Sequence, residues 1–336
     1  MAPVDRDLIE TEVRPVSPFR LPRRNGSDRI VQRHGGGLRR LLVKDGAAVI
    51  VAVRPSGSGS YRFSAAAVPP DQVSGPGSES LVEADAARIE AALEDFRFSL
   101  GIDDDMSPFR DAFKSDALLG PAIRDRIQSR SPRRADPWEA LAWAVTEQLI
   151  EYRRAAAIQR RMVSRWGLSV AVEPAAGDRQ YRGGDRLRTA PSPEAIAAAS
   201  PAELQACDLG AKRAIALIRA AREVSRGRVN LHDPDDDRRL LAIPEIGPWT
   251  AACLALRGRG DPDALLAGDL GHIKLVGALA GFGRLAEVEE VEDFYAPYAP
   301  FRGLAGDFLL GARGGVVRGP GNRARIRSFA RPAKAA

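Results

Sequence analysis

Residues 243–250 read Ile-Pro-Glu-Ile-Gly-Pro-Trp-Thr, and this stretch, with the lone Asp269 downstream of it, decides the fold. An apolar-Pro-x-apolar-Gly turn between two short helical segments, 238–242 and 249–256, is typical of a helix–hairpin–helix. Such a turn presents successive backbone amides at the start of its second helix, where they and the helix dipole bind one phosphate without reading bases. A phosphate-binding turn followed by a carboxylate therefore predicts chemistry on a DNA nucleotide.

Length and composition set the outer limits. The chain has 336 residues, of which 44% are hydrophobic, so it can bury more than one domain core. No run approaches the roughly eighteen consecutive apolar residues of a membrane helix. Residues 1–20 lack the apolar segment of a secretory signal. We therefore expect a protein of the cytoplasm, associated with the nucleoid, with no membrane partner.

Metal and cofactor chemistry has little support in the sequence. The two cysteines, Cys207 and Cys253, are too few for an all-cysteine zinc site or a four-thiolate iron–sulfur cluster. The three histidines, His34, His232 and His272, lie far apart and show no metal-ligand spacing. We therefore expect no catalytic metal and no cofactor.

The net charge of +6 is concentrated at the C-terminus. Residues 313–336 carry seven basic side chains and no acidic one, in a segment rich in Gly and Pro. This composition predicts a flexible basic tail suited to phosphate contacts, and it is equally compatible with a solvated tail without function. At the other end, residues 1–15 are predicted to be disordered.

The pattern between residues 16 and 100 predicts a small antiparallel α/β domain. Asp45-Gly46 between two apolar runs, 41–43 and 47–53, is a strong hairpin signal because both turn residues must adopt positive φ. We expect a third strand over 61–68, a loop over 69–79 and a helix over 81–98.

Residues 101–312 show mainly helical periodicity. The strongest segment is 137–166, which begins with Asp136 as N-cap and Pro137 at the first helical position. We expect a polar linker over 173–191 and further helices that begin after Ser192 and Ser200 and that cover 212–225, 270–281 and 286–310. The predicted fold class is α+β, with a small N-terminal antiparallel α/β domain followed by a mostly helical core that contains the hairpin at 238–256.

Asp269 has two interpretations from its local sequence. It precedes Leu270-Gly271-His272, so it fits a helix N-cap, and most such aspartates only cap. A carboxylate near a phosphate-binding turn also fits catalysis. The local sequence leaves both open.

Taken together, these segments resemble the helix–hairpin–helix (HhH-GPD) DNA glycosylase superfamily, and most of all the AlkA-like 3-methyladenine DNA glycosylase II branch. The resemblance is carried by the hairpin at 240–251, by Gly268-Asp269-Leu270, and by segments 137–150, 209–214 and 299–303. It covers residues 100–312. It implies a helical glycosylase core and a monomer whose partner is double-stranded DNA with damaged bases.

The resemblance also implies roles for single residues. Asp269 would stabilise the cationic sugar as the glycosidic bond breaks. Gln148 and Leu149 would form the wedge that fills the gap left by a flipped nucleotide. The hairpin amides of Glu245, Gly247 and Thr250 would hold a phosphate. The carbonyls of Leu241 and Ile243 would hold a monovalent Na⁺ or K⁺. The base pocket would be lined by Trp249, Cys253, Leu270 and Leu310.

Trp249 separates subfamilies. Relatives that also cut the strand carry a lysine at this position as an amine nucleophile, which tryptophan cannot replace. We therefore predict a monofunctional glycosylase that hydrolyses the bond to an alkylated purine and leaves an abasic site. Whether Trp249 lines the base pocket or is a plain core aromatic stays open.

Two departures from the family pattern bear on the substrate. Glu245 stands where the family usually has the first glycine of the hairpin, and Cys253, Leu270 and Leu310 replace pocket aromatics. The alternatives are therefore a non-catalytic helix–hairpin–helix DNA-binding protein, or a glycosylase for deaminated or oxidised bases. His272, three residues after Asp269 and on nearly the same helix face, could contact a phosphate or the carboxylate, but it is expected to be a solvated helix residue.

Overall fold

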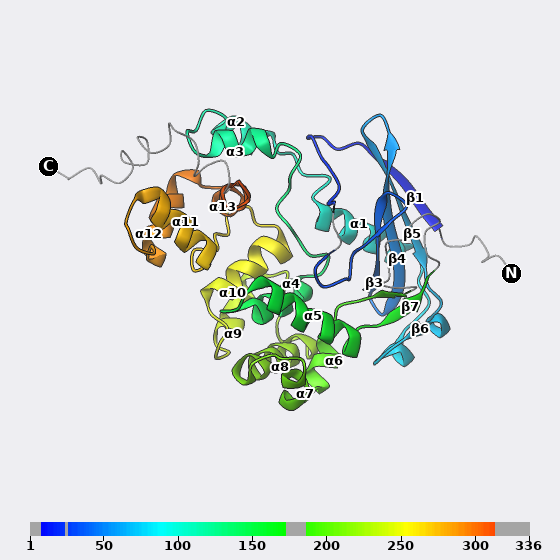
Figure 1. The fold of residues 1–336 in the computed structure, drawn as a ribbon. Coiled ribbons are helices and arrows are strands. Elements are labelled where there is room, and N and C mark those ends of the chain that lie inside the picture. The colour runs from blue at the N-terminus through cyan, green and yellow to red at the C-terminus, as the bar shows by residue number, and fades with distance from the viewer. Residues whose placement is uncertain (1–7, 24–25, 173–185, 313–336) are drawn as a thin grey trace.

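The computed structural model describes residues 8–23, 26–172 and 186–312 (Figure 1). The predicted basic tail at 313–336, the first residues of the predicted disordered N-terminus and most of the predicted linker at 173–191 lie outside these ranges. Within the described ranges, no helix combines the length and the apolar character needed to cross a membrane.

A five-stranded antiparallel sheet forms the N-terminal part. Its strands follow the spatial order β1 (Leu8–Val13), β5 (Ser60–Ala67), β4 (Ala47–Gly57), β3 (Gly37–Lys44) and β2 (Gln32–His34). The β3–β4 hairpin turns at Asp45 and Gly46, whose φ angles of 45° and 77° confirm the predicted turn. Helix α1 (Ala86–Leu100) packs on this sheet, where Phe96 meets Phe63 edge to face in a shared core.

The predicted disorder of residues 1–15 is wrong for residues 8–13, which form β1. This strand pairs with β5 from Leu8 opposite Ala66 to Val13 opposite Tyr61. It lies at the sheet edge and buries little beyond Val13. Its order therefore comes from backbone pairing with a distant segment, which local composition does not reveal.

A second sheet joins the N-terminal part to the helices. It consists of β6 (Val73–Ser74), β7 (Ser169–Ala171) and β8 (Arg186–Arg188), all antiparallel. The predicted loop at 69–79 thus contains β6 and the 3-10 turns η1 (Pro70–Gln72) and η2 (Ser78–Ser80), and the predicted linker at 173–191 contains β8. Val73, Val170 and Leu187 pack with Leu41 of the large sheet. Strands of two or three residues are too short to leave a periodic signal.

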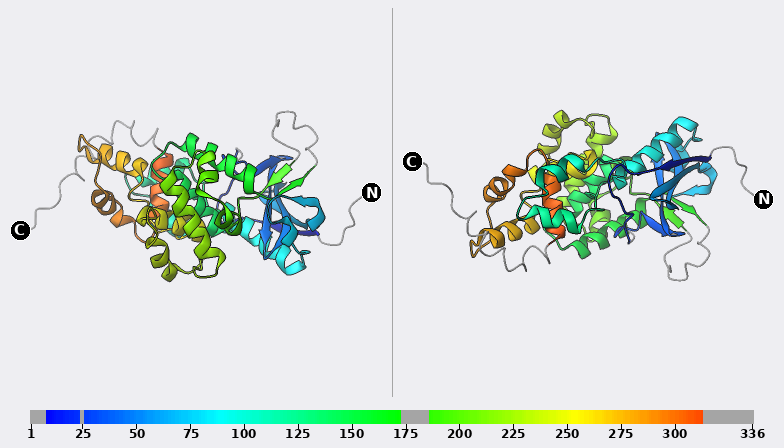
Figure 2. Two further views of the ribbon diagram at one scale, coloured as in Figure 1. Left: turned by 90° about the horizontal axis from the view of Figure 1, so that it is seen from below. Right: turned by 90° about the horizontal axis from the view of Figure 1, so that it is seen from above.

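The helices pack around two cores. The first core contains residues of α4 (Pro137–Glu147), α5 (Tyr152–Trp166), α6 (Pro193–Ala198), α7 (Pro201–Ala206), α8 (Ala211–Ser225) and α9 (Asp237–Leu241). The second contains residues of α2 (Ser107–Phe113), α3 (Leu119–Asp125), α11 (Leu270–Ala280), α12 (Val288–Tyr295), η5 (Ala296–Tyr298) and α13 (Arg302–Gly311). Between them lie α10 (Pro248–Cys253) and its π-helical continuation η4 (Leu254–Arg259), and η3 (Pro234–Asp236) precedes α9. Figure 2 shows the large sheet and α11–α13 at opposite ends of the molecule.

The predicted helix starts are confirmed by their caps. The Asp136 carboxylate accepts a hydrogen bond from the Trp138 amide, and Ser192 accepts one from Ala195. Ser200 forms a full capping box with Glu203. These signals are local, so the sequence reveals them directly.

Two segments predicted as continuous helices are broken. The 137–166 segment stops at Glu147 and resumes at Tyr152, because Leu149 adopts a positive φ of 55°. The 286–310 segment divides into α12, η5 and α13, where Pro297 and Pro300 lack the amide that a helix interior needs. The apolar periodicity continues across both breaks, so it does not locate them.

Candidate functional site

The hairpin joins α9 to α10 as predicted. Ile243 and Ile246 are buried and hold the turn against the first core, whereas Leu241 is exposed. Gly247 caps α10 from an extended backbone, and its carbonyl accepts hydrogen bonds from the amides of Thr250 and Ala251 at 3.0 and 3.1 Å. The Thr250 amide, predicted to hold a phosphate, is therefore already engaged, and Pro248 has no amide. Within the described residues the amides of Gly247 and Trp249 have no backbone acceptor, so these two can receive an anion.

Glu245 occupies the glycine position of this turn with a strained backbone. Its φ is 74°, in the left-handed region that favours glycine. Its carboxylate lies 3.7 Å from the Nζ of Lys212, at the start of α8, on the molecular surface. The negative charge that the sequence places beside the phosphate grip is therefore partly balanced by a lysine.

The predicted wedge is bonded to the hairpin. Leu149 is completely exposed, with a relative accessibility of 104%, at the tip of the loop between α4 and α5. Nε2 of Gln148 donates to the Glu245 carbonyl at 2.7 Å and to Oγ1 of buried Thr250 at 2.9 Å. Nη1 of Arg213 donates to the Gln148 carbonyl at 3.1 Å. The structure thus brings Gln148 to Glu245 and Thr250, which lie 97 and 102 residues further along the chain.

Asp269 is the N-cap of α11 and lies half-buried. Its Oδ1 accepts a hydrogen bond from the Gly271 amide at 2.6 Å, and within the described residues its second oxygen has no hydrogen-bond partner. Both interpretations from the sequence are therefore compatible with the geometry, since one oxygen caps and the other is available.

Trp249 lies beside this aspartate. A side chain at Gly268 would approach Cβ of Trp249 to 3.8 Å, so the tryptophan passes close to the residue before Asp269. Its indole Nε1 is buried and, among the described residues, has no hydrogen-bond partner. A buried donor without a partner is costly, so a polar ligand atom there would be favourable.

The other three predicted pocket residues lie in different surroundings. Cys253 is fully buried in a small cluster packed against Trp249, and burial raises the pKa of its thiol to about 12. Leu270 is half-exposed on the first turn of α11. Leu310 is partly buried against the second core. Cys253 therefore lies beneath the surface and is not available as a nucleophile near neutral pH.

The prediction of a solvated His272 is wrong. The imidazole is buried, with Nδ1 3.1 Å from the hydroxyl of Tyr295 on α12. Helix α13 packs directly over it, because a side chain at Gly306 would reach within 2.6 Å of its Cε1. His272 therefore joins α11 to α12 and α13.

Residues without a predicted role complete the surroundings. Nη1 of Arg257, in η4, pairs with Glu147 at the end of α4 at 3.0 Å. Asp307, on α13, accepts a hydrogen bond from the hydroxyl of Ser131. Their sequence neighbourhoods give no sign that these groups meet, since they come from four separate segments.

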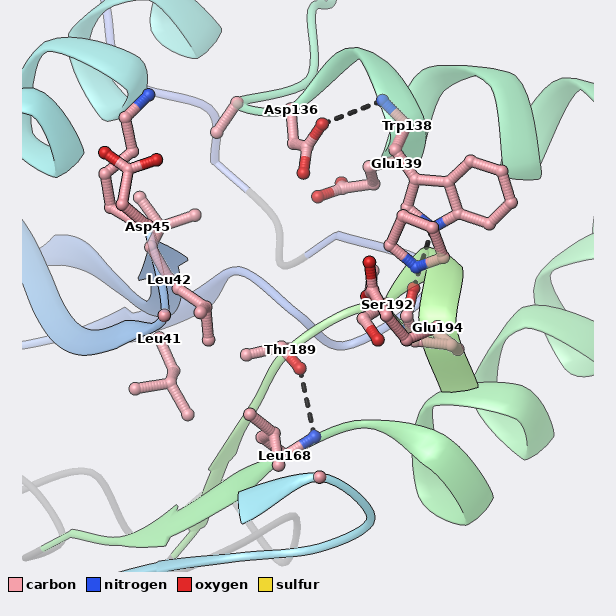
Figure 3. A pocket seen from close by; sticks show the side chains of 18 of the residues that line it. Leu41, Leu42, Asp45, Asp136, Trp138, Glu139, Leu168, Thr189, Ser192 and Glu194 are labelled. Atoms are coloured by element: carbon pink, nitrogen blue, oxygen red, sulfur yellow. Dashed lines mark hydrogen bonds between the residues drawn. The ribbon is translucent and has the colours of Figure 1, made fainter. Parts of the chain in front are cut away.

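A cavity of about 540 Å³ lies at the opposite end of α4 (Figure 3). Asp136, Trp138 and Glu139 line it from the start of that helix, and Ser192 and Glu194 line it from the start of α6. Burial raises the pKa of Asp136, against the hydrogen bond from the Trp138 amide. None of the predicted DNA-contacting residues lines this cavity, so it is distinct from the hairpin site.

No family model matches the chain. The chain is 27% identical over 214 residues to a DNA-3-methyladenine glycosylase of Bacillus subtilis, which covers 62% of this chain and 67% of that protein. It is 31% identical over 212 residues to a probable bifunctional transcriptional activator/DNA repair enzyme AlkA of Mycobacterium tuberculosis, covering 59% of this chain and 40% of that one.

Among solved structures, a 3-methyladenine DNA-glycosylase from Archaeoglobus fulgidus superposes with a TM-score of 0.69 at 20% identity. The match covers 91% of this chain and 99% of that one. The two chains therefore share their fold over both the N-terminal sheet and the helical part.

Proposed function

We infer that the chain belongs to the AlkA-like branch of the helix–hairpin–helix DNA glycosylases, and we propose that it is a base-excision repair enzyme that removes alkylated purines from DNA. The observation that carries this proposal is the arrangement of Asp269. One of its oxygens does not take part in capping, and the preceding residue, Gly268, lies against Trp249 on α10, the helix that directly follows the hairpin. The same hairpin is hydrogen-bonded to Gln148, the residue before the exposed Leu149. A DNA-binding module without chemistry needs the oxygen of Asp269 that caps α11 and has no use for the second one.

The proposed reaction begins with extrusion of the damaged nucleotide. A base inside a duplex cannot be reached, and unstacking it costs a few kcal/mol. Leu149 would enter the stack and occupy the vacated space, while the amides at Gly247 and beyond hold a neighbouring phosphate. The apolar side chain is fully exposed before binding, so its burial between bases helps to offset the cost of extrusion.

Asp269 would then stabilise the sugar as the glycosidic bond breaks. An alkylated purine carries a positive charge and leaves as a neutral base, so the positive charge moves to the sugar. A carboxylate fixed opposite that charge stabilises the transition state without reorganisation. Water then adds to the sugar carbon and leaves an abasic site. Trp249 has no amine to attack the sugar, so we propose that the strand is not cut.

The test is release of free base from methylated duplex DNA. Wild type should release methylated purines, and Asp269→Asn should abolish release while it still binds an abasic-site duplex in fluorescence anisotropy. Loss of binding together with activity would instead indicate that Asp269 only supports α11. Gel filtration of the protein alone should give the mass of a monomer.

The main alternative is a DNA-binding protein that keeps the scaffold without activity. The strained Glu245 and the exposed Leu270 favour it, because neither improves a phosphate grip or a base pocket. A panel of duplexes with alkylated, deaminated and oxidised bases decides the matter. If wild type releases none of them and still binds DNA, the enzyme proposal fails.

A monovalent cation at the hairpin completes the proposal. The Ile243 carbonyl accepts one hydrogen bond, from the Ile246 amide at 3.0 Å, so a second lone pair is left for Na⁺ or K⁺ together with the Leu241 carbonyl. Replacing K⁺ by tetramethylammonium at constant ionic strength should weaken DNA binding. Unchanged affinity would remove the cation from the interface.

A further inference from the structure

A second carboxyl group lies near Asp269, on a helix that the proposed reaction does not use. Asp307 is on α13, one helical turn before Leu310 and on the same side of the helix. Glycines bring α13 close to the segment around Asp269, because a side chain at Gly303 would collide with the carbonyl of Ala264, and one at Gly306 with His272. Ala264 and His272 lie on either side of Asp269 in the chain, so Asp307 lies against the region that they bracket.

The surroundings of Asp307 differ from those of the other acidic residues on this side of the molecule. Asp263 pairs with Arg302 at 2.6 Å, whereas Asp307 forms no ion pair with any residue that the structure describes. Its carboxylate accepts the hydroxyl of Ser131, and its backbone carbonyl, rather than its side chain, accepts Nη1 of Arg126 at 3.1 Å. The carboxyl is therefore partly buried without a direct cationic partner.

The surroundings of Asp307 shift the pKa of its carboxyl in opposite directions. Burial raises the pKa of its carboxyl, and the negative charge of Asp269 raises it further, while the Ser131 hydroxyl, Arg257 and Arg126 oppose this rise. Arg257 is itself paired with Glu147, which weakens its effect on Asp307. The thiol of Cys253 also lies within reach of this group and is uncharged, because burial raises its pKa to about 12.

The two carboxyl groups thus have different environments. Asp269 lies at the N-terminus of α11, accepts the Gly271 amide and is reached by solvent. Asp307 lies deeper, near Asp269. A carboxyl group whose pKa is raised by burial is better suited than an exposed one to donate a proton, so Asp307 is the candidate acid of the two.

We propose that Asp307 is a general acid that protonates the departing base, and that it extends the enzyme to purines that leave uncharged only when they are protonated. An alkylated purine needs no such acid, because it already carries the positive charge. A deaminated purine such as hypoxanthine is neutral and would have to leave as an anion. This inference rests on the proposed glycosylase function and deepens it.

The proposed step conserves electrons and protons. As the bond from the sugar to the base breaks, its electron pair stays with the base, and the Asp307 hydroxyl gives its proton to a ring nitrogen, directly or through one water molecule. Asp307 becomes an anion, which Arg126 and Arg257 stabilise, and Asp269 stabilises the sugar cation. Water adds its oxygen to the sugar, and its proton restores the acid on Asp307.

The experiment compares two lesions in one duplex sequence under single-turnover conditions. Asp307→Asn should lower the rate of hypoxanthine release by about a hundredfold or more, the usual contribution of a general acid, and should change 7-methylguanine release by less than about threefold. Asp293→Asn, which alters an exposed carboxylate on α12, is the matched control and should change neither rate. Thermal melts establish that both variants fold.

The pH profile supplies a readout that a structural role would not move. With wild type, hypoxanthine release should fall as pH rises through the pKa of Asp307, because the acid form is needed, and 7-methylguanine release should not follow this limb. Ser131→Ala removes a hydrogen bond that lowers the pKa of Asp307, so it should shift the limb to higher pH.

Each other outcome is decisive. If Asp307→Asn folds and releases both bases more slowly by the same factor, or releases both at the wild-type rate, Asp307 is not an acid for the leaving base. If wild type releases 7-methylguanine and no hypoxanthine, the extension to neutral bases is wrong, although the glycosylase proposal stands. If wild type releases neither lesion, the proposed function itself fails.

Discussion

Glu245→Gly is expected to tighten DNA binding, and the magnitude follows from the structure. The substitution removes two features at once: a non-glycine side chain at a φ of 74°, and a carboxylate 3.7 Å from Lys212 beside the phosphate-binding turn. The carbonyl that receives Gln148 is a backbone group, so it remains in the variant.

The two contributions have separate magnitudes. Relief of the left-handed backbone is worth about 1 kcal/mol, of which the greater freedom of glycine in the unfolded chain cancels roughly half. The charge contribution follows from Coulomb's law: a carboxylate about 8 Å from a phosphate in water costs about 0.5 kcal/mol. Release of Lys212 from its partner adds a similar attraction. Together these charges correspond to about a fivefold lower Kd.

Glu245→Gln separates the two effects, since it removes the charge and keeps a side chain at the strained position. We expect both variants to bind an abasic-site duplex about fivefold more tightly in fluorescence anisotropy at low salt, with the gain shrinking as salt screens it. The glycine variant alone should gain thermal stability, by about 1 °C. Glu90→Gln, at an exposed position of α1, is the control. The reasoning is refuted if neither Glu245 variant binds more tightly than this control.

Three further predictions concern the wedge and the tail. Leu149→Ala should leave the melting temperature unchanged, because the side chain is fully exposed. It should slow base release about tenfold or more, since the loss of about 1.4 kcal/mol of stabilisation by the wedge is enough for a tenfold change. An unchanged rate would exclude Leu149 from the base stack. Gln148→Ala removes both hydrogen bonds to the hairpin and should lower the free energy of unfolding by about 1–2 kcal/mol in urea melts. DNA binding should weaken as well, and normal binding would show that the hairpin and the wedge act independently. Deleting residues 313–336 should reduce the slope of log K against log salt by about 0.9 for each phosphate that the tail neutralises in the full-length protein, and an unchanged slope would place the tail outside the interface.

The sequence predicts those parts of the fold whose causes are local. The β3–β4 turn follows from Asp45-Gly46, and the starts of α4 and α7 follow from Asp136 and Ser200. The hairpin turn likewise needs only its own apolar and glycine residues. In each case the interaction that fixes the backbone lies within a few residues, so the local sequence suffices.

What the sequence misses depends on partners far along the chain. His272 has the pattern of a solvated helix residue, yet it is buried because Gly306, on another helix, leaves room for its ring. The break after Glu147 carries no proline or glycine, and Leu149 continues the apolar pattern there. At that break Leu149 adopts a positive φ, and the neighbouring Gln148 bonds to the hairpin, a contact that exists only after the chain has folded.

These same bonds explain why a strained residue is tolerated at the centre of the site. The left-handed backbone of Glu245 presents its carbonyl to Gln148, and Gln148 also holds Thr250 on the first turn of α10. A phosphate bound at that turn is therefore held at a fixed distance from Leu149, one residue beyond Gln148. Trp249, next to Thr250, also lies close to Gly268, the residue before Asp269. In the proposed enzyme these contacts would place the phosphate site, the wedge and the carboxylate relative to one another, and the strain at residue 245 would be the cost of that arrangement.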